Sequence, residues 1–314
     1  MRIGGWTENE DKAIITAWSD TNPGEMYYYD RNKGKIAFIA KSRPWIDKNE
    51  MSPMLPISFK ARDGLTVNGY LTVPKNSDGK NLPLIINPHG GPASRDVWGY
   101  NPEHQFFASR GYAVLSMNFR GSTGYGRSHV KMANGQWGRK MQDDVTDSVN
   151  WAVDQGIADK DNVCIYGASY GGYAVMAGIT KTPKMYKCAV NYVGVTDMGL
   201  LFSKMPKVWE IWEEQQKIEI GDYDNDKDYL DAVSPINLVD RIETPLYIVH
   251  GVRDWRVPIQ HAQRLRKELE KNGKKEGEDF WWLVKGDEGH GFYKEANKME
   301  PVSYTHLRAH ETPA

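Results

Sequence analysis

Cysteine, net charge and long apolar runs are all scarce in this chain of 314 residues. The two cysteines, Cys164 and Cys188, each lie in an apolar stretch, so we interpret both as small buried hydrophobic residues and not as a disulfide framework. No apolar run approaches the length of a membrane span, and the N-terminus lacks the apolar core of a signal peptide. These absences predict a cytoplasmic protein.

The charges of the chain nearly cancel, with 40 basic and 41 acidic residues and a formal net charge of −1. They are well mixed, so there is no basic stripe that would attract nucleic acid or an anionic membrane. Histidine, cysteine and carboxylate residues do not cluster at the spacing of metal ligands. We therefore expect neither a nucleic-acid nor a membrane partner, and no metal or other cofactor.

Most of the chain has the pattern of an α/β protein. Hydrophobic residues make up 40% of it, which is enough to bury a substantial core. From residue 56 onward, a hairpin-like pair of runs around Asp63 is followed by six short apolar strand-like runs that alternate with helical segments. Short apolar strands are typical of sheets covered on both faces, so the pattern predicts a mostly parallel sheet flanked by helices.

The first 45 residues differ from the rest. Three short strand-like runs are separated by turn signals such as N-P-G at 22–24, which predicts an antiparallel β-meander. Because so few strands are only marginally stable alone, we expect the meander to pack on the main domain. The predicted organisation is a meander at 1–45, a catalytic domain at 46–300 and a tail at 301–314. The tail lacks apolar periodicity and is interpreted as non-native.

A candidate nucleophile lies in the sequence G-A-S-Y-G-G at 167–172. The motif follows an apolar strand and precedes a helical segment, which is the setting of a nucleophile elbow. In such an elbow a tight turn projects the serine hydroxyl, and glycines on either side allow strand and helix to approach closely. The pattern therefore predicts that Ser169 is a catalytic nucleophile of an α/β-hydrolase fold.

The serine requires a base, and in this fold the chain order is serine, acid, histidine. Among the histidines that follow Ser169 and precede the tail, His250 ends a predicted strand and His261 lies in a predicted helix. His290 instead lies in a glycine-rich loop after the last predicted strand, where it can reach over the elbow. We therefore predict His290 as the base.

The acid that orients the base is expected just after the preceding strand. Asp254 holds that position, where its carboxylate can accept a hydrogen bond from the imidazole of His290. Asp197, which follows one strand earlier, is the alternative because some hydrolases place their acid there. Asp254 is the preferred assignment.

Two further loops complete the predicted site. The amide of Tyr170, directly after the nucleophile, is expected to donate to the oxyanion, and a second donor is expected from the glycine loop at 87–92. The loop at 118–126 is glycine-rich but lacks the ending of a nucleotide-binding loop. Its Arg120 is interpreted as a structural residue in preference to a substrate clamp.

Aromatic residues near the predicted site are candidates for a substrate pocket. Trp209 and Trp212 fall in about fifty residues without a predicted strand, which we interpret as a helical insertion over the ligand-binding edge of the sheet. Tyr125 and Trp255 follow other predicted strands. Each of the tryptophans fits core packing as well as it fits a pocket wall.

The motifs together resemble a known family. PHGGP, NFRGSTGYG, GASYGG, HGVRDWRVP and GDEGHGF occur in the order and approximate spacing of the prolyl oligopeptidase family, nearest to its acylaminoacyl-peptidase-like branch. The resemblance covers residues 56–298. It implies the same triad, and it implies that Gly91 and Tyr170 supply the oxyanion amides. Family members usually carry an N-terminal β-propeller, of which residues 1–45 resemble the last blade and linker. Without the other blades of the propeller, the selection for short peptides would be lost.

The predicted function is therefore acyl-bond hydrolysis through an acyl-enzyme on Ser169. Small carboxylic esters, short acylated peptides, or both are the expected substrates, and an acylaminoacyl-peptidase or oligopeptidase proper is the alternative. A catalytically idle binding remnant is the alternative outside enzymes. Dehalogenase chemistry is disfavoured because it requires a carboxylate at the nucleophile position. A homo-oligomer is left open.

Overall fold

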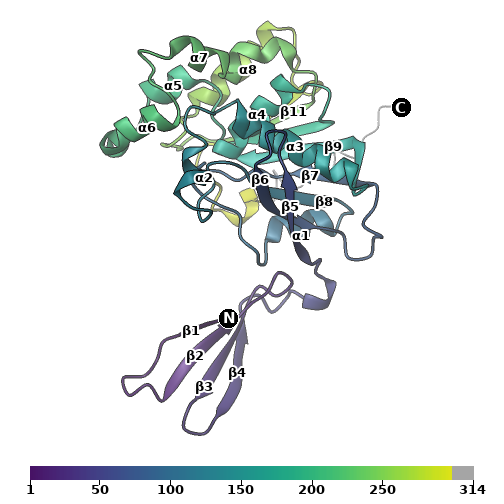
Figure 1. Cartoon of the computed structure of the whole chain (residues 1–314), viewed down its shortest axis with the longest axis vertical. Coiled ribbons are helices and arrows are strands. Elements are labelled where there is room, and N and C mark those ends of the chain that lie inside the picture. Colours follow the sequence, from purple (N-terminus) through teal and green to yellow (C-terminus); the bar gives the residue numbers. More distant parts are fainter. Residues whose placement is uncertain (299–314) are drawn as a thin grey trace.

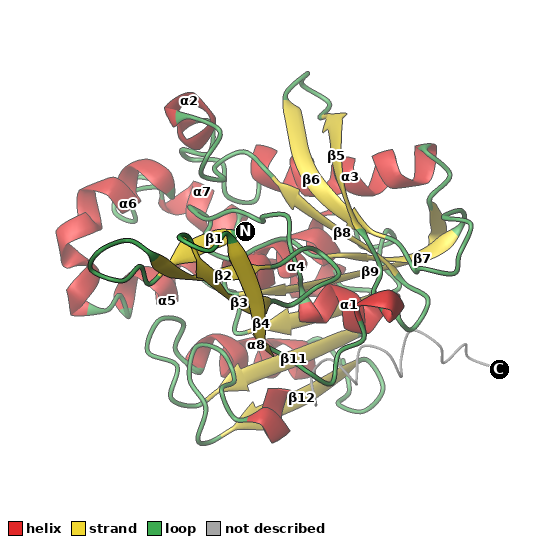
Figure 2. Ribbon diagram, turned by 90° about the horizontal axis from the view of Figure 1, so that it is seen from below, coloured by secondary structure: helices red, strands yellow, loops and turns green. Residues whose placement is uncertain are grey.

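The computed structural model describes residues 1–298 and contains two sheets. The larger sheet has eight strands in the order β12-β11-β10-β9-β7-β8-β6-β5. Figure 2 shows β5 and β6 at one edge of it and β11 and β12 at the other. Its strands are β5 (Met54–Lys60), β6 (Thr66–Thr72), β7 (Leu82–Ile86), β8 (Ala113–Asn118), β9 (Ala158–Ala168), β10 (Cys188–Tyr192), β11 (Leu246–Gly251) and β12 (Phe280–Lys285).

Six of these strands run parallel, from β8 to β12 through β7, whereas β6 pairs antiparallel with both β5 and β8. The predicted α/β-hydrolase fold is thus confirmed, with the hairpin and all six short apolar strands in place. The predicted tail at 301–314 lies outside the described residues.

Alternate residues of the central strands supply two separate cores, one on each face of the sheet. On β7, Leu84 and Ile86 belong to the core shared with α3 and α4, and Ile85 belongs to the core shared with α1. The main helices are α1 (Pro102–Ala108), α2 (Arg127–Lys131), α3 (Lys140–Asp154), α4 (Tyr170–Lys181) and α8 (Gln260–Lys271).

The predicted insertion between β10 and β11 is helical. Figure 1 shows its helices gathered at the end of the molecule far from the N-terminus. They are α5 (Met198–Ser203), α6 (Glu213–Glu219) and α7 (Lys227–Ala232), with the 3-10 helices η2 (Lys207–Trp212) and η3 (Pro235–Arg241). Within the described part of the chain, no helix combines the length and apolar character that crossing a membrane requires.

The N-terminal meander has four strands where about three were expected, and it contacts the main domain through Asp20, whose side chain accepts from the amide of Met54 at 2.8 Å and whose carbonyl accepts from the Gln105 side chain at 3.3 Å. Its strands are β1 (Arg2–Gly4), β2 (Lys12–Ala17), β3 (Glu25–Asp30) and β4 (Lys35–Lys41), and the 3-10 helix η1 (Lys48–Glu50) follows. The sheet projects away from the hydrolase domain (Figure 1), and Ile36 and Phe38 of β4 are 62% and 56% exposed. Its aromatic side chains instead pack on one another, as Tyr27 and Phe38 do at 5.8 Å between ring centroids.

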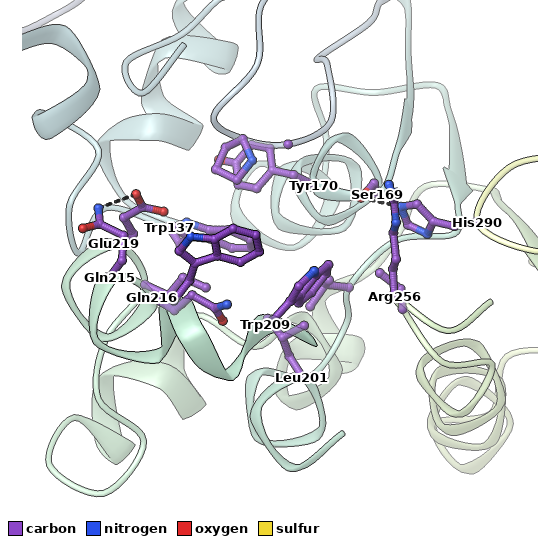
Figure 3. A pocket seen from close by; sticks show the side chains of 16 residues that line it. Trp137, Ser169, Tyr170, Leu201, Trp209, Gln215, Gln216, Glu219, Arg256 and His290 are labelled. Atoms are coloured by element: carbon purple, nitrogen blue, oxygen red, sulfur yellow. Dashed lines mark hydrogen bonds between the residues drawn. The ribbon is translucent and has the colours of Figure 1, made fainter. Parts of the chain in front are cut away.

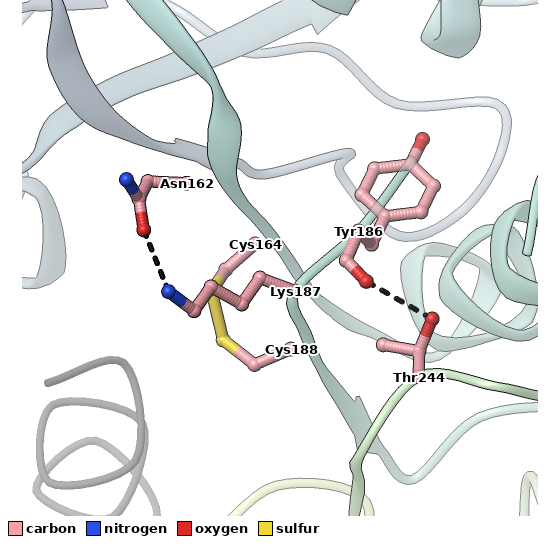
Figure 4. Close-up of a disulfide and its surroundings, with 6 residues drawn as sticks. All are labelled: Asn162, Cys164, Tyr186, Lys187, Cys188 and Thr244. Atoms are coloured by element: carbon pink, nitrogen blue, oxygen red, sulfur yellow. Dashed lines mark hydrogen bonds between the residues drawn. A yellow bond between two sulfur atoms is a disulfide. The ribbon is translucent and has the colours of Figure 1, made fainter. Parts of the chain in front are cut away.

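The interpretation of the two cysteines is also wrong, because Cys164 and Cys188 form a disulfide (Figure 4). Both are buried as expected, at 3% and 8% exposure. However, β9 and β10 pair in a register that places Cys188 directly opposite Cys164. Disulfides are typical of oxidising compartments, and the cytoplasmic location stays a prediction.

Loss of this disulfide is expected to lower the free energy of unfolding by about 3 kcal/mol, because it closes a loop with a sequence separation of 24. Urea unfolding with and without dithiothreitol measures the effect. The C164A/C188A double variant serves as the control, since dithiothreitol should leave its midpoint unchanged. An equal shift in the wild type and the double variant would contradict the prediction.

Candidate active site

Ser169 occupies the turn between β9 and α4 in a strained conformation, with φ 60° and ψ −120°. The glycines around it are required by close backbone contacts. A Cβ on Gly167 would lie 2.5 Å from the carbonyl oxygen of Gly171, and a Cβ on Gly171 would lie 2.3 Å from that of Pro88. Strand, helix and the 87–92 loop therefore meet around the serine, as a nucleophile elbow requires.

The structure brings the three predicted triad residues together. The Nε2 atom of His290 lies 2.9 Å from the Oγ atom of Ser169, and its Nδ1 atom lies 2.7 Å from Oδ2 of Asp254. The Asp254 side chain is fully buried and that of His290 is 13% exposed. Because the carboxylate only accepts hydrogen bonds, Nδ1 carries the proton, and Nε2 is free to accept the proton of the serine hydroxyl.

The alternatives considered from the sequence lie elsewhere. Asp197 caps α5 by accepting from the amide of Leu200 at 2.9 Å, and it pairs with Arg264 at 2.8 Å. His261 is buried and accepts from the backbone of Thr196, 3.2 Å away. Neither residue contacts Ser169 or His290 in any hydrogen bond of the described chain.

Hydrogen bonds from the Asp254 and His250 side chains to backbone groups hold the loop that carries Asp254. Oδ1 of Asp254 accepts from the amides of Arg256 and Val257, both at 2.9 Å. His250, at the end of β11, donates from Nε2 to the carbonyl of Val257 at 2.8 Å. Burial lowers the pKa of His250, so its neutral form persists beside the carboxylate. Sequence analysis considered His250 only as a base and missed this supporting contact.

The loop that carries His290 is anchored by a buried carboxylate. Glu288 is 2% exposed, and its side chain accepts from the amides of Tyr293 and Lys294 at 2.9 and 3.0 Å and from Asn297 at 2.8 Å. The hydrogen bond from Asn297, with those from the two amides, lowers the pKa of Glu288, which keeps it ionised. The chain on both sides of His290 is thereby held in place.

Tyr192, at the end of β10, links the turn of Ser169 to the loop of His290. Its carbonyl accepts from the amide of Ser169 at 2.9 Å, and its hydroxyl accepts from the amide of Phe292, two residues after His290. Its ring also packs on Phe292 with 5.2 Å between centroids. No motif marks Tyr192, because its role depends on the place of β10 next to β9 in the sheet.

The two amides assigned to the oxyanion hole belong to the loop and helix that meet at Ser169. Gly91 and Tyr170 both line the same cavity as Ser169 and His290. Among the described residues, neither amide donates a hydrogen bond to another group of the chain. His89 supports this loop, because it contacts the carbonyl of Gly90 at 2.7 Å and the hydroxyl of Ser122 at 2.8 Å.

A cavity of about 520 Å³ opens beside the triad (Figure 3). Trp209 and Trp212 line it as predicted, but Tyr125 and Trp255 do not. The hydroxyl of Tyr125 accepts from the Asn118 side chain at 2.9 Å, and the Trp255 ring lies 6.1 Å from that of Trp209. Residues that sequence analysis did not place in the pocket include Trp137, Val195, Leu201, Gln216, Glu219 and Arg256.

Arg120 is buried and structural, in agreement with the interpretation from the sequence. Its guanidinium forms ion pairs with Asp144 at 2.6 Å and with Asp63 at 2.9 Å. These contacts connect the 118–126 loop to α3 and to the β5–β6 turn. Arg120 is not among the described residues that line the cavity, which fits a role in the scaffold of the site.

Sequence comparisons give relatives over nearly the whole chain. A dipeptidyl aminopeptidase BIII from Pseudoxanthomonas mexicana is 38% identical over 298 residues, which cover 92% of this chain and 43% of that protein. Dipeptidyl peptidase family member 6 from Caenorhabditis elegans is 32% identical over 311 residues, which cover 91% and 42%. The chain thus spans less than half the length of these curated relatives.

Solved structures share the fold. A puromycin-hydrolyzing peptidase from Mycobacterium tuberculosis superposes with a TM-score of 0.85 at 24% identity, covering 95% of this chain and 45% of that one. An acylaminoacyl peptidase from Pyrococcus horikoshii superposes with a TM-score of 0.82 at 22% identity, covering 98% of this chain and 48% of that one.

The model of the prolyl oligopeptidase family matches residues 98–306. The resemblance seen in five short motifs is therefore confirmed, and this chain belongs to the prolyl oligopeptidase family.

Proposed function

We propose that this chain is a serine hydrolase that cleaves acyl bonds with Ser169, His290 and Asp254. The observation that supports this most strongly is the continuous hydrogen-bonded relay, 2.7 Å from Asp254 to His290 and 2.9 Å from His290 to Ser169. His290 takes the hydroxyl proton as Ser169 attacks the carbonyl carbon, and it then gives that proton to the leaving group. Water, activated in the same way, releases the acyl group from Ser169.

The tetrahedral intermediate needs donors for its oxyanion, and the amides of Gly91 and Tyr170 are proposed for this task. Both belong to residues that line the cavity at Ser169. Tyr170 is the first residue of α4, where backbone amides lack partners inside the helix and carry positive potential. Such donors stabilise the charge that develops on the oxygen in the transition state.

Short peptides are the proposed natural substrates, with small esters as a further activity of the same site. Relatives named dipeptidyl aminopeptidase and acylamino-acid-releasing enzyme support peptide cleavage. Arg256 lines the cavity on the same side as Ser169 and His290 in Figure 3. Its guanidinium can donate to a carbonyl or carboxylate of a bound peptide.

Parallel assays with p-nitrophenyl esters, acetyl-aminoacyl anilides and dipeptidyl anilides test this proposal. We expect turnover in at least the ester and one anilide series, together with labelling of Ser169 by a fluorophosphonate probe. Turnover of esters alone would contradict the peptide assignment. Folded protein that neither labels nor turns over any substrate would contradict the hydrolase function and favour an idle remnant.

A further inference from the structure

The cavity at the triad has an acidic end. Figure 3 shows Glu219 and Gln215 on the side opposite Ser169 and His290, with Trp137 and Trp209 between. Glu219 is the last residue of α6, and it is the only carboxylate among the described residues that line this cavity. Its side chain therefore borders a cavity that extends to Ser169.

Among the described residues, no cation forms an ion pair with the carboxylate of Glu219. Its Oε1 atom accepts from the Gln215 side chain at 2.6 Å, and it forms no ion pair within residues 1–298. The neighbouring acids on the same helix differ, because Glu213 and Glu214 each pair with Lys217 at 3.1 Å. Glu219 is also partly buried, so its charge is less hydrated than theirs.

The walls between the two ends of the cavity are apolar and aromatic. They are formed by side chains of the insertion and of the neighbouring loops, namely Trp137, Val195, Leu201, Trp209, Trp212 and Ile220. Aromatic faces accept cations as well as methylene groups. Low-dielectric walls of this kind also strengthen the interaction of a charge with its counter-charge.

A positive charge lies at the other end of the cavity. Arg256 is on the side of His290 in Figure 3, so a cationic group on a ligand is repelled there and attracted toward Glu219. The side chain of the substrate residue whose carbonyl is attacked by Ser169 would therefore place a long apolar stem between the tryptophans. Its tip would meet the carboxylate.

We propose that Glu219 determines specificity, by selecting substrates in which the residue that supplies the scissile carbonyl is lysine or arginine. This inference rests on the proposed function, since it assigns the acyl side chain to the cavity beside Ser169. Lysine and norleucine share the same straight stem and differ in the terminal ammonium, so comparing them isolates the contribution of Glu219.

The test uses p-nitrophenyl esters of Nα-acetyl lysine, norleucine and glutamate with the full chain. In the wild type, kcat/KM for the lysine ester is expected to exceed that for the norleucine ester by about tenfold, as for a charge-assisted contact. In E219Q this ratio should fall to near one, because kcat/KM for the lysine ester falls and kcat/KM for the norleucine ester rises. E219K should reverse the preference toward the glutamate ester.

E214Q is the matched control, because Glu214 lies on the same helix, is 87% exposed and does not line the cavity. It should keep the wild-type ratio of lysine to norleucine. A wild-type ratio of one or less, or a ratio unchanged by E219Q, would overturn the inference. If norleucine ester turns over in that case, the hydrolase function still stands, whereas failure of all three esters would count against that function itself.

Discussion

Replacing Ser169 with alanine is expected to lower kcat by about 10⁶-fold, because it removes the hydroxyl that is proposed to attack the carbonyl carbon. The elbow turn already accommodates a side chain at φ 60°, so alanine keeps the local backbone and removes only the hydroxyl next to Nε2 of His290. Turnover of the best ester or anilide substrate and labelling by a fluorophosphonate probe should both disappear.

S128A is a suitable control for this variant, since Ser128 is exposed on α2 and outside the cavity. It should retain wild-type turnover and labelling. Thermal unfolding should show that both variants remain folded. Turnover by folded S169A at more than a small fraction of the wild-type rate would show that another residue is the nucleophile.

Replacing Asp254 with asparagine is expected to lower kcat by about 10⁴-fold, through the wrong tautomer of the base. In the wild type, Oδ1 of Asp254 accepts from two backbone amides and Oδ2 faces Nδ1 of His290. The amide oxygen of asparagine must stay with the two backbone donors, because an NH₂ group there would meet them unsatisfied. The NH₂ group then points at Nδ1, and the proton moves to Nε2, where it blocks acceptance from Ser169.

The variant D197N distinguishes this assignment from the alternative acid. Asp197 caps α5 and pairs with Arg264, so its replacement should change kcat by only a few-fold while lowering stability slightly. Steady-state kinetics of both variants near neutral pH give the comparison. A large loss in D197N with a small loss in D254N would reverse the roles of the two residues.

Much of the fold was predictable because it depends on local patterns. Each of the six parallel strands contains a short apolar run, and Gly167, Gly171 and Ser169 form a turn whose geometry is set within a few residues. The catalytic loops were predictable for a related reason. Parallel strands end at one edge of the sheet, so motifs that follow β9, β11 and β12 must converge there.

Other features were not predictable because they depend on how distant segments meet. The disulfide requires the register that sets Cys164 opposite Cys188, and the apolar surroundings of each cysteine say nothing about that register. The exposure of the meander is a second case, because its marginal stability led us to expect packing on the main domain, whereas strand patterns do not show that β4 leaves Ile36 and Phe38 exposed. Tyr125 was assigned to the pocket, but Asn118 holds its hydroxyl elsewhere.

The sequence alone determined the family of this protein and located the residues of its proposed chemistry: a serine in a tight turn, and a histidine and an aspartate after later strands. Only the tertiary structure decided what surrounds that chemistry. Tyr192 became the link between two loops, and Glu219 came to line the same cavity as Ser169 and His290. A sequence motif reflects interactions between residues that are close in the chain. The surroundings of Tyr192 and Glu219 instead arise from the order of strands in the sheet and from the packing of an inserted helix.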